Sequence, residues 1–379
     1  MKNNPLQQLQ NFGQSFWLDY IRRDLLRSGE LKRMINDDGL RGMTSNPSIF
    51  EKAISETTLY DADIQKLSSE GMSPEKIYSI LTQQDVSEAA DEFRPLYDSS
   101  EATAGYVSLE VNPNLAHDTK GTINEARALW DAVNRPNIMI KVPATIEGLP
   151  AITQLISEGI NVNVTLLFGL QRYRAVAQAY IKGMRELQKK GKSMKSVFSV
   201  ASFFLSRIDV LIDPMIEKIE EEAGANKADV ASLHGEVAIL SAKAAYEIYS
   251  EIFGNSEFQA LKNLGAKPQQ LLWASTSTKD PTYSDVKYVE ALIGPDTVNT
   301  LPPETIDAYR DHGKPEGRLV IDMKDAQKKL NSLQSAGIDL NAITNQLEQE
   351  GVKKFIKAYD LLINSLVEKT NTQSVKSSA

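Results

Sequence analysis

Short apolar segments alternate with longer amphipathic segments along almost the whole chain. The segment Ile138–Val142 reads Ile-Met-Ile-Lys-Val and is followed directly by Pro143. An apolar run without alternating polar residues predicts a strand that is buried on both faces. Proline cannot donate a hydrogen bond to a neighbouring strand, so it predicts the end of this one. Eight segments have strand character: Phe16–Tyr20, Leu40–Thr44, Tyr106–Val111, Ile138–Val142, Val162–Leu167, Val197–Phe203, Gln270–Ser275 and Asp296–Leu301.

Amphipathic segments of helical period lie between these strands. Strands that alternate with helices imply a parallel sheet joined by right-handed crossovers. Eight such units in a chain of 379 residues favour an α/β fold of the closed (β/α)8 TIM-barrel type. The alternative is an open doubly wound sheet, but the glycine-rich first turn that it usually carries is missing. The clearest helical segments are Thr122–Val133, Leu149–Ile156, Leu170–Lys189, Ser206–Glu222 and Asp229–Ile252.

Two further helical regions account for the length beyond an ordinary barrel. Residues 51–97 form a long polar insertion after the second strand, and its Ser73-Pro74-Glu75 triplet is a helix-start signal. Residues 322–369 are also mostly helical in pattern. We therefore expect residues 1–369 to form a single barrel domain with added helices. The segment 370–379 is polar and has no apolar period, so we expect it to be disordered.

The overall composition is that of a globular enzyme, with 41% hydrophobic and 24% charged residues. The net charge of −8 argues against nucleic acid or an anionic membrane as partner, since both favour basic surfaces. The chain has no cysteine, which excludes disulfides, thiolate metal sites and cysteine nucleophiles. Because its start has no apolar signal segment and no stretch has the length of a membrane span, we expect a cytoplasmic protein.

Several common catalytic patterns are missing from the sequence. It contains neither a phosphate-binding loop that ends in Gly-Lys-Ser/Thr nor a Gly-x-Ser-x-Gly nucleophile elbow. The three histidines, His117, His234 and His312, lie far apart, and none is at ligand spacing from another. We therefore expect neither a metal site nor a cofactor.

Polar residues recur at the carboxyl ends of the predicted strands, where barrel enzymes carry their chemistry. Lys141 is the most unusual, because lysine is rarely buried without a partner. Burial favours the free amine, which attacks carbonyl compounds; a lysine that extends from the strand end to solvent is the alternative. Each of the others alone is more often a hydrogen-bonded structural residue, but their recurrence around one lysine indicates an active site. They are Asp19, Asn46, Glu110, Asn163, Thr165, Ser202, Arg207, Ser275, Ser277 and Lys279.

Many of these residues lie in motifs that resemble the transaldolase family, in particular its longer bacterial branch. The motifs come in the family's order and cover the chain to about residue 366. A Thr-x-Asn-Pro motif followed later by an Ile-Lys-x-Pro-x-Thr strand is far more specific than either motif alone. The matching segments are Trp17-Leu-Asp19, Thr44-Ser-Asn-Pro-Ser48, Val107-Ser-Leu-Glu-Val111, Ile140-Lys-Val-Pro-Ala-Thr145, Asn163-Val-Thr-Leu-Leu-Phe168 and Ser202–Arg207.

The resemblance implies a (β/α)8 barrel that transfers a dihydroxyacetone unit between sugar phosphates. The donor would be sedoheptulose 7-phosphate or fructose 6-phosphate, and the acceptor glyceraldehyde 3-phosphate or erythrose 4-phosphate. Lys141 would form a Schiff base, and Asp19 would take the proton from the substrate C4 hydroxyl. Glu110 and Thr165 would hold the water that moves protons during imine formation and hydrolysis.

Elementary chemistry agrees with these roles. An iminium accepts the electrons of a breaking carbon–carbon bond, so a lysine amine can replace a metal. The reaction also needs two carboxylates with different proton tasks, one for the sugar hydroxyl and one for the carbinolamine water. Asp19 and Glu110 are the available pair.

The resemblance also implies which residues bind the substrate. Asn46 and Asn163 would bind the hydroxyls of the dihydroxyacetone unit, and Ser202 would assist. Arg207 would bind the phosphate, for which a planar guanidinium with several donors is well suited.

One position departs from the family pattern. Other branches carry a second phosphate-binding arginine just after the seventh strand, and here that position is Ser277. We expect Lys279 to supply the second cation as a point charge; the alternative is a solvated loop lysine. Phe204 and Trp273 are candidates for pocket walls, although large aromatic residues are more often part of the core.

Two other functions stay open at this point. A fructose 6-phosphate aldolase would release free dihydroxyacetone, but family relatives of that kind are much shorter and lack the 51–97 insertion and the C-terminal helices. A non-catalytic sugar-phosphate-binding protein would predict the loss of Lys141, Asp19 or Glu110, and none is lost. The expected partners are small sugar phosphates, and a homodimer through exposed helices is compatible with the sequence.

Overall fold

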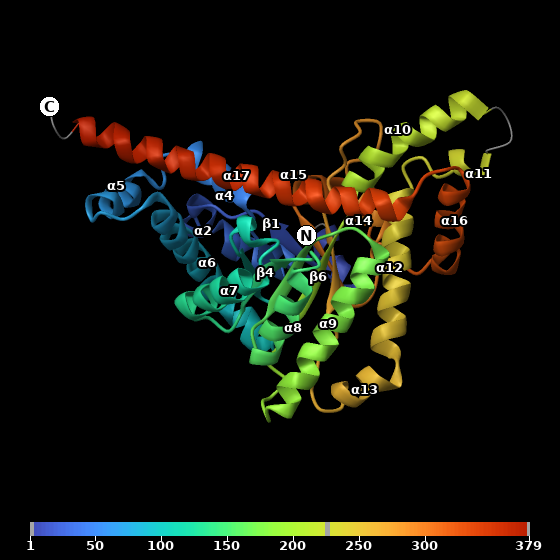
Figure 1. Cartoon of the computed structure of the whole chain (residues 1–379), viewed down its shortest axis with the longest axis horizontal. Coiled ribbons are helices and arrows are strands. Elements are labelled where there is room, and N and C mark those ends of the chain that lie inside the picture. Colours follow the sequence, from blue (N-terminus) through green and yellow to red (C-terminus); the bar gives the residue numbers. More distant parts are fainter. Residues whose placement is uncertain (1–3, 224–227, 377–379) are drawn as a thin grey trace.

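The strands form a closed barrel of eight parallel strands in the order β1 to β8. The computed structural model describes residues 4–223 and 228–376 (Figure 1). All eight predicted strands are present, and their ends differ from the predicted ones by two residues or fewer. They are β1 (Gln14–Asp19), β2 (Gly42–Thr44), β3 (Tyr106–Glu110), β4 (Ile138–Pro143), β5 (Val162–Leu167), β6 (Ser199–Phe204), β7 (Gln270–Ala274) and β8 (Thr297–Leu301).

Helices follow the strands and cover the outside of the barrel, as the alternating pattern predicts. The predicted helix Asp229–Ile252 is interrupted, because Gly235 adopts a left-handed φ of 70° and its N–H donates to Asp213 Oδ1 at 2.8 Å instead of continuing a helix. The helices outside the added regions are α1 (Pro5–Gln8), α2 (Arg23–Arg27), α3 (Glu30–Arg33), α7 (Thr119–Val133), α8 (Gly148–Glu158), α9 (Leu170–Lys189), α10 (Ser206–Ala223), α11 (Ala228–Ala231), α12 (Val237–Gly254), α13 (Ser256–Lys262), α14 (Lys287–Ala291) and α15 (Pro303–His312).

The insertion between β2 and β3 consists of three helices, α4 (Pro47–Ser55), α5 (Asp61–Ser69) and α6 (Pro74–Ser99). Ser73 caps α6, since its hydroxyl accepts a hydrogen bond from the Lys76 N–H at 3.3 Å. The helix-start signal in the sequence is therefore confirmed.

The C-terminal region forms α16 (Met323–Ser335) and the long helix α17 (Leu340–Lys376). In Figure 1, α17 runs across the whole molecule, and it packs against α4, α5 and α6 along one part and against α10 and β5 along another. The helix continues beyond residue 370, where we expected order to end, and residues 377–379 lie outside the described residues. Within the described chain, no helix is long and apolar enough to cross a membrane.

The barrel interior is filled by large side chains below the carboxyl ends of the strands. Trp17 of β1 is 1% exposed, and its ring occupies the space beside Gly42 of β2. A Cβ at residue 42 would lie 2.6 Å from that ring, so only glycine allows β2 to approach it. This packed interior leaves polar side chains to gather at the carboxyl end of the barrel.

Candidate active site

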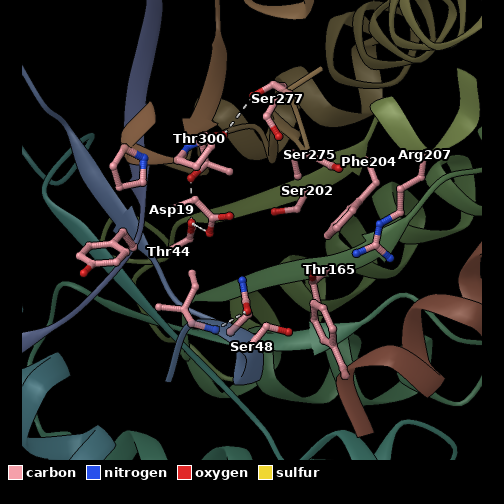
Figure 2. Close-up of a pocket in the computed structure, with 18 of the residues that line it drawn as sticks. Asp19, Thr44, Ser48, Thr165, Ser202, Phe204, Arg207, Ser275, Ser277 and Thr300 are labelled. Atoms are coloured by element: carbon pink, nitrogen blue, oxygen red, sulfur yellow. Dashed lines mark hydrogen bonds between the residues drawn. The ribbon is translucent and has the colours of Figure 1, made fainter. Parts of the chain in front are cut away.

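A cavity of about 590 Å³ opens at the carboxyl ends of the strands (Figure 2). Of the predicted site residues, Glu110 and Asn163 lie just beneath it: Glu110 contacts Lys141, and Asn163 bonds to Ser202. The structure therefore brings these predicted residues together. The ten that line the cavity are Asp19, Asn46, Lys141, Thr165, Ser202, Phe204, Arg207, Ser275, Ser277 and Lys279.

Lys141 is buried at the base of this cavity and does not extend to solvent, since its side chain is 5% exposed. Its Nζ donates to the backbone carbonyl of Ser45 at 2.9 Å and lies 3.4 Å from Glu110 Oε2. The strand register places Glu110 and Asn163 directly beside it on β3 and β5. Neighbouring parallel strands thus hold the lysine between a carboxyl and an amide.

Glu110 is an acid in an unusual environment. Neither of its carboxyl oxygens accepts a hydrogen bond of good geometry from the residues that the structure describes. Burial raises the pKa of Glu110 to about 7, although the positive charge of Lys141 lowers it and the negative charge of Asp19 raises it. A carboxyl with a pKa near neutrality can both donate and accept a proton.

Asp19 is held at the end of β1 by a chain of hydroxyl groups. The Thr44 hydroxyl donates to Asp19 Oδ1 at 2.6 Å and lies 2.7 Å from the Thr300 hydroxyl. Burial raises the pKa of Asp19, while Lys141 and the Thr44 hydrogen bond lower it. Because Thr44 donates its only hydrogen to Asp19, its oxygen must accept from Thr300.

Asn163 lies on the opposite side of Lys141 from Glu110 and is surrounded by further polar side chains. Its amide Nδ2 donates to Ser108 Oγ at 3.0 Å, and Ser202 Oγ donates to its Oδ1 at 2.7 Å. The buried hydroxyl of Thr165 has no hydrogen-bond partner among the described residues. Asn46 caps helix α4, because its Oδ1 accepts from the Ile49 N–H at 3.1 Å.

Arg207 lies at the opposite side of the cavity from Asp19 (Figure 2). Arg207 comes from the first turn of α10, and its guanidinium carbon lies 5.6 Å from the centre of the Phe204 ring. Burial lowers the pKa of Arg207. The Lys279 ammonium donates to Ser277 Oγ at 2.6 Å, so the lysine beside the substituted arginine position does reach the cavity.

Two residues that line the cavity, Phe355 and Thr300, were not predicted from the sequence, and the candidate Trp273 does not line it. Trp273 does not line the cavity, because its side chain is fully buried and its indole N–H donates to the Leu292 carbonyl at 3.1 Å. Phe355 of α17 does line it, although nothing near residue 355 in the sequence marks a site. Thr300, which also lines the cavity, is the last polar residue of the eighth predicted strand, and the rule used for the other seven strands would have found it.

The described residues contain no group of three or more His, Cys, Asp or Glu side chains arranged to hold a metal. Each histidine pairs with acids outside the cavity: His117 with Glu147, His234 with Glu217, and His312 with Asp285 and Asp311. The side chains that line the cavity offer amine, carboxyl, hydroxyl and guanidinium groups.

The closed barrel and its cavity define a (β/α)8-barrel enzyme whose buried lysine is suited to covalent catalysis on a carbonyl compound. The family model described as transaldolase/fructose-6-phosphate aldolase matches residues 16–366. The chain belongs to this family.

Named relatives match the chain over nearly its whole length. It is 47% identical to transaldolase 2 of Nostoc sp., with 99% of this chain and 100% of the relative covered. It is 48% identical to the transaldolase of Trichodesmium erythraeum, with 97% and 98% covered. A transaldolase of Thermobifida fusca is 44% identical over 96% of this chain and 98% of its own length.

Proposed function

We propose that this protein is a transaldolase (EC 2.2.1.2) of the pentose phosphate pathway, with sugar phosphates as its substrates. It transfers a dihydroxyacetone unit from sedoheptulose 7-phosphate or fructose 6-phosphate to glyceraldehyde 3-phosphate or erythrose 4-phosphate. Full-length relatives named transaldolase support this function. The observation that carries the chemistry is the buried Lys141 Nζ, 3.4 Å from Glu110 and in one cavity with Asp19.

In this proposal, the amine of Lys141 attacks the ketone carbon of the donor to give a carbinolamine. Glu110, with the Thr165 hydroxyl, transfers protons to and from the carbinolamine and the water that leaves it. The Glu110 pKa of about 7 suits proton transfer in both directions. Loss of water turns the carbinolamine into an iminium. Asp19 then takes the C4 hydroxyl proton, the C3–C4 bond breaks, its electron pair moves into the iminium to form an enamine, and the shortened aldehyde (erythrose 4-phosphate or glyceraldehyde 3-phosphate) leaves. The enamine adds to the carbonyl carbon of the acceptor aldehyde, whose oxygen takes the proton back from Asp19, and hydrolysis of the new iminium releases the product and restores the lysine amine.

The phosphate of the substrate is placed at the cationic side of the cavity. Arg207 supplies a fixed fork of donors, and Lys279 supplies the second cation in place of an arginine at Ser277. The Lys279–Ser277 hydrogen bond of 2.6 Å supports this assignment, since it holds the lysine ammonium beside another residue that lines the cavity. Asn46, Asn163 and Ser202 bind the dihydroxyacetone hydroxyls at the lysine side.

Borohydride trapping with fructose 6-phosphate tests the lysine. The expected result is a reduced dihydroxyacetone adduct in the intact mass, which peptide mapping places on Lys141 and which Lys141→Ala lacks. A folded protein that binds the sugar phosphate and yields no adduct would contradict the mechanism and favour a binding protein. Product analysis separates the two enzymes, because a transaldolase needs an acceptor aldehyde and an aldolase releases free dihydroxyacetone without one.

Two further points belong to the proposal. A cytoplasmic location is supported by the cysteine-free sequence, which suits a reducing compartment. A homodimer would make the melting temperature rise with protein concentration, and sedimentation measures the assembly directly.

A further inference from the structure

One face of α17 lies against the mouth of the barrel. Residues along this face recur every three or four positions, which is the helical spacing of one side. Phe355 is 5% exposed and lines the cavity. Glu348, two turns earlier, forms a partly buried ion pair of 3.0 Å with Arg172 at the start of α9. Between these two contacts, on the same face, lies Gly351.

At Gly351 the α17 backbone packs against residues at the phosphate side of the cavity. A Cβ at this residue would lie 3.0 Å from Leu166 Cδ2 and 3.7 Å from both Arg207 Nη1 and Phe168 Cε2. Glycine is the poorest helix former after proline, so its place in the interior of a 37-residue helix needs a structural reason. The close approach to these three residues supplies one.

The residues beneath Gly351 belong to the wall that holds the guanidinium. The Phe168 and Phe204 rings pack with centres 5.2 Å apart, and Phe204 lies 5.6 Å from the Arg207 guanidinium carbon. Leu166 has a left-handed φ of 56° at an irregularity between β5 and β6. A leucine rarely adopts this backbone conformation, and tight packing from above helps to maintain it.

We propose that Gly351 is a positioning residue for phosphate recognition, which lets α17 hold the Arg207 guanidinium between the helix backbone and Phe204. This inference rests on the proposed role of Arg207 in binding the phosphate. An alanine Cβ at residue 351 would touch Arg207 at an ordinary contact distance of 3.7 Å and would require Leu166 Cδ2, 3.0 Å away, to shift by a few tenths of an ångström. A larger side chain displaces Leu166 and Arg207 or pushes α17 outward. Phosphate affinity then falls, while the lysine chemistry at the far side of the cavity continues.

The test compares Gly351→Ala and Gly351→Leu with the control Gly254→Ala. Gly254 is the last residue of α12, and apart from its chain neighbours and the backbone of its own helix, no heavy atom of the described residues lies within 4 Å of its Cβ position. The measurements are KM and kcat with glyceraldehyde 3-phosphate and with unphosphorylated glyceraldehyde as acceptor, and the inhibition constant of inorganic phosphate. We expect Gly351→Leu to raise the KM for the phosphorylated acceptor and the inhibition constant of phosphate about three- to tenfold, which corresponds to the loss of part of one charge-assisted contact. Gly351→Ala should raise both quantities in the same direction but less.

The kinetic pattern separates positioning from a merely structural role. Positioning leaves kcat/KM with glyceraldehyde nearly unchanged, and the control behaves as wild type. Equal losses with both acceptors, or no change in either Gly351 variant, would overturn the inference. If Gly351→Leu does not fold, Gly351→Ala decides alone, since alanine favours the helix.

Arg207→Ala distinguishes this inference from the proposed function. Suppose that Arg207→Ala is no longer inhibited by phosphate, whereas the Gly351 variants keep the wild-type KM and inhibition constant. This result would refute the positioning role of Gly351 but would support the phosphate site at Arg207. Retained phosphate inhibition in Arg207→Ala would refute the phosphate site itself and the inference that rests on it.

Discussion

Glu110 shows how strongly the barrel interior alters a single side chain. The carboxyl is 4% exposed and lacks a well-formed hydrogen bond to the described residues, so its charged form loses hydration without full replacement. Lys141 and Asp19 act on it in opposite directions, but burial has the larger effect and leaves the pKa at about 7. Poor solvation brings the Glu110 pKa into the range that suits proton transfer. It also lowers the stability of the folded protein when the carboxyl is charged.

We expect Glu110→Gln to flatten the pH dependence of stability. The folded protein keeps the Glu110 proton up to a pKa of about 7, whereas an ordinary glutamate loses it near 4.5. The stabilising contribution is therefore complete below pH 4.5 and is lost as the pH rises through 7. Between pH 5 and pH 8, the free energy of unfolding should fall by about 2–3 kcal/mol more in wild type than in the variant. Urea unfolding across this range measures the difference, and parallel curves would contradict the pKa.

The sequence predicts the reactive residues better than their immediate partners. Asp19, Lys141 and the others could be found because parallel strands of a barrel bring their carboxyl ends to one face. The carbonyl of Ser45, which accepts from Lys141, is a backbone group and has no sequence signal. Phe355 reaches the cavity only because α17 crosses the barrel, and no local pattern specifies that crossing.

At the scale of elements, a buried ion cluster fixes the helical insertion to the barrel. Arg23 of α2 is 3% exposed and contacts the fully buried Asp85 of α6 at 3.0 Å; it also pairs with Asp63 of α5 at 2.5 Å. The Tyr60 hydroxyl donates to the second oxygen of Asp85 at 2.7 Å. One arginine therefore joins two of the inserted helices to α2.

We expect Arg23→Met to destabilise the protein by about 3–5 kcal/mol, because it leaves the Asp85 carboxylate buried without its cation. Arg27→Met is the matched control: Arg27 lies on the same helix and also pairs with α6, through Glu88, but both side chains are well exposed. Such a surface pair contributes about 1 kcal/mol or less. Denaturant unfolding measures the free energy of unfolding of both variants. Equal losses would show that the buried cluster contributes no more to stability than the surface pair.

The sequence predicts the boundaries of helices and strands closely where the hydrophobic period is regular, and less closely where tertiary contacts decide them. Helix α9 has the predicted bounds Leu170–Lys189, because its period is regular to both ends. The break before α12 was not predicted, since the apolar pattern continues through Gly235 and only the Asp213 contact reveals the turn. Such tertiary hydrogen bonds leave no trace in local periodicity.

At the scale of the whole molecule, we expect the barrel and its added helices to unfold as one unit. Helix α17 contacts the insertion, the barrel and α10, so none of these parts has an independent core. In a Trp130→Phe variant, which removes the tryptophan of α7, fluorescence comes from Trp17 and Trp273 and reports on the barrel strands in which both are buried. Far-ultraviolet circular dichroism reports mainly on the helices. The two denaturation curves should coincide. An earlier loss of helical signal would show that the insertion or α17 is a separate domain.

The closure of β1 onto β8 also limits how two copies of this chain can meet. An open sheet ends in strands with unpaired backbone groups, which can pair with a strand of another molecule and start aggregation. In this closed barrel every strand has a neighbour on both sides, so the barrel has no such edge to offer. A dimer must therefore be built from helix surfaces, and growth by strand addition would first require the barrel to open.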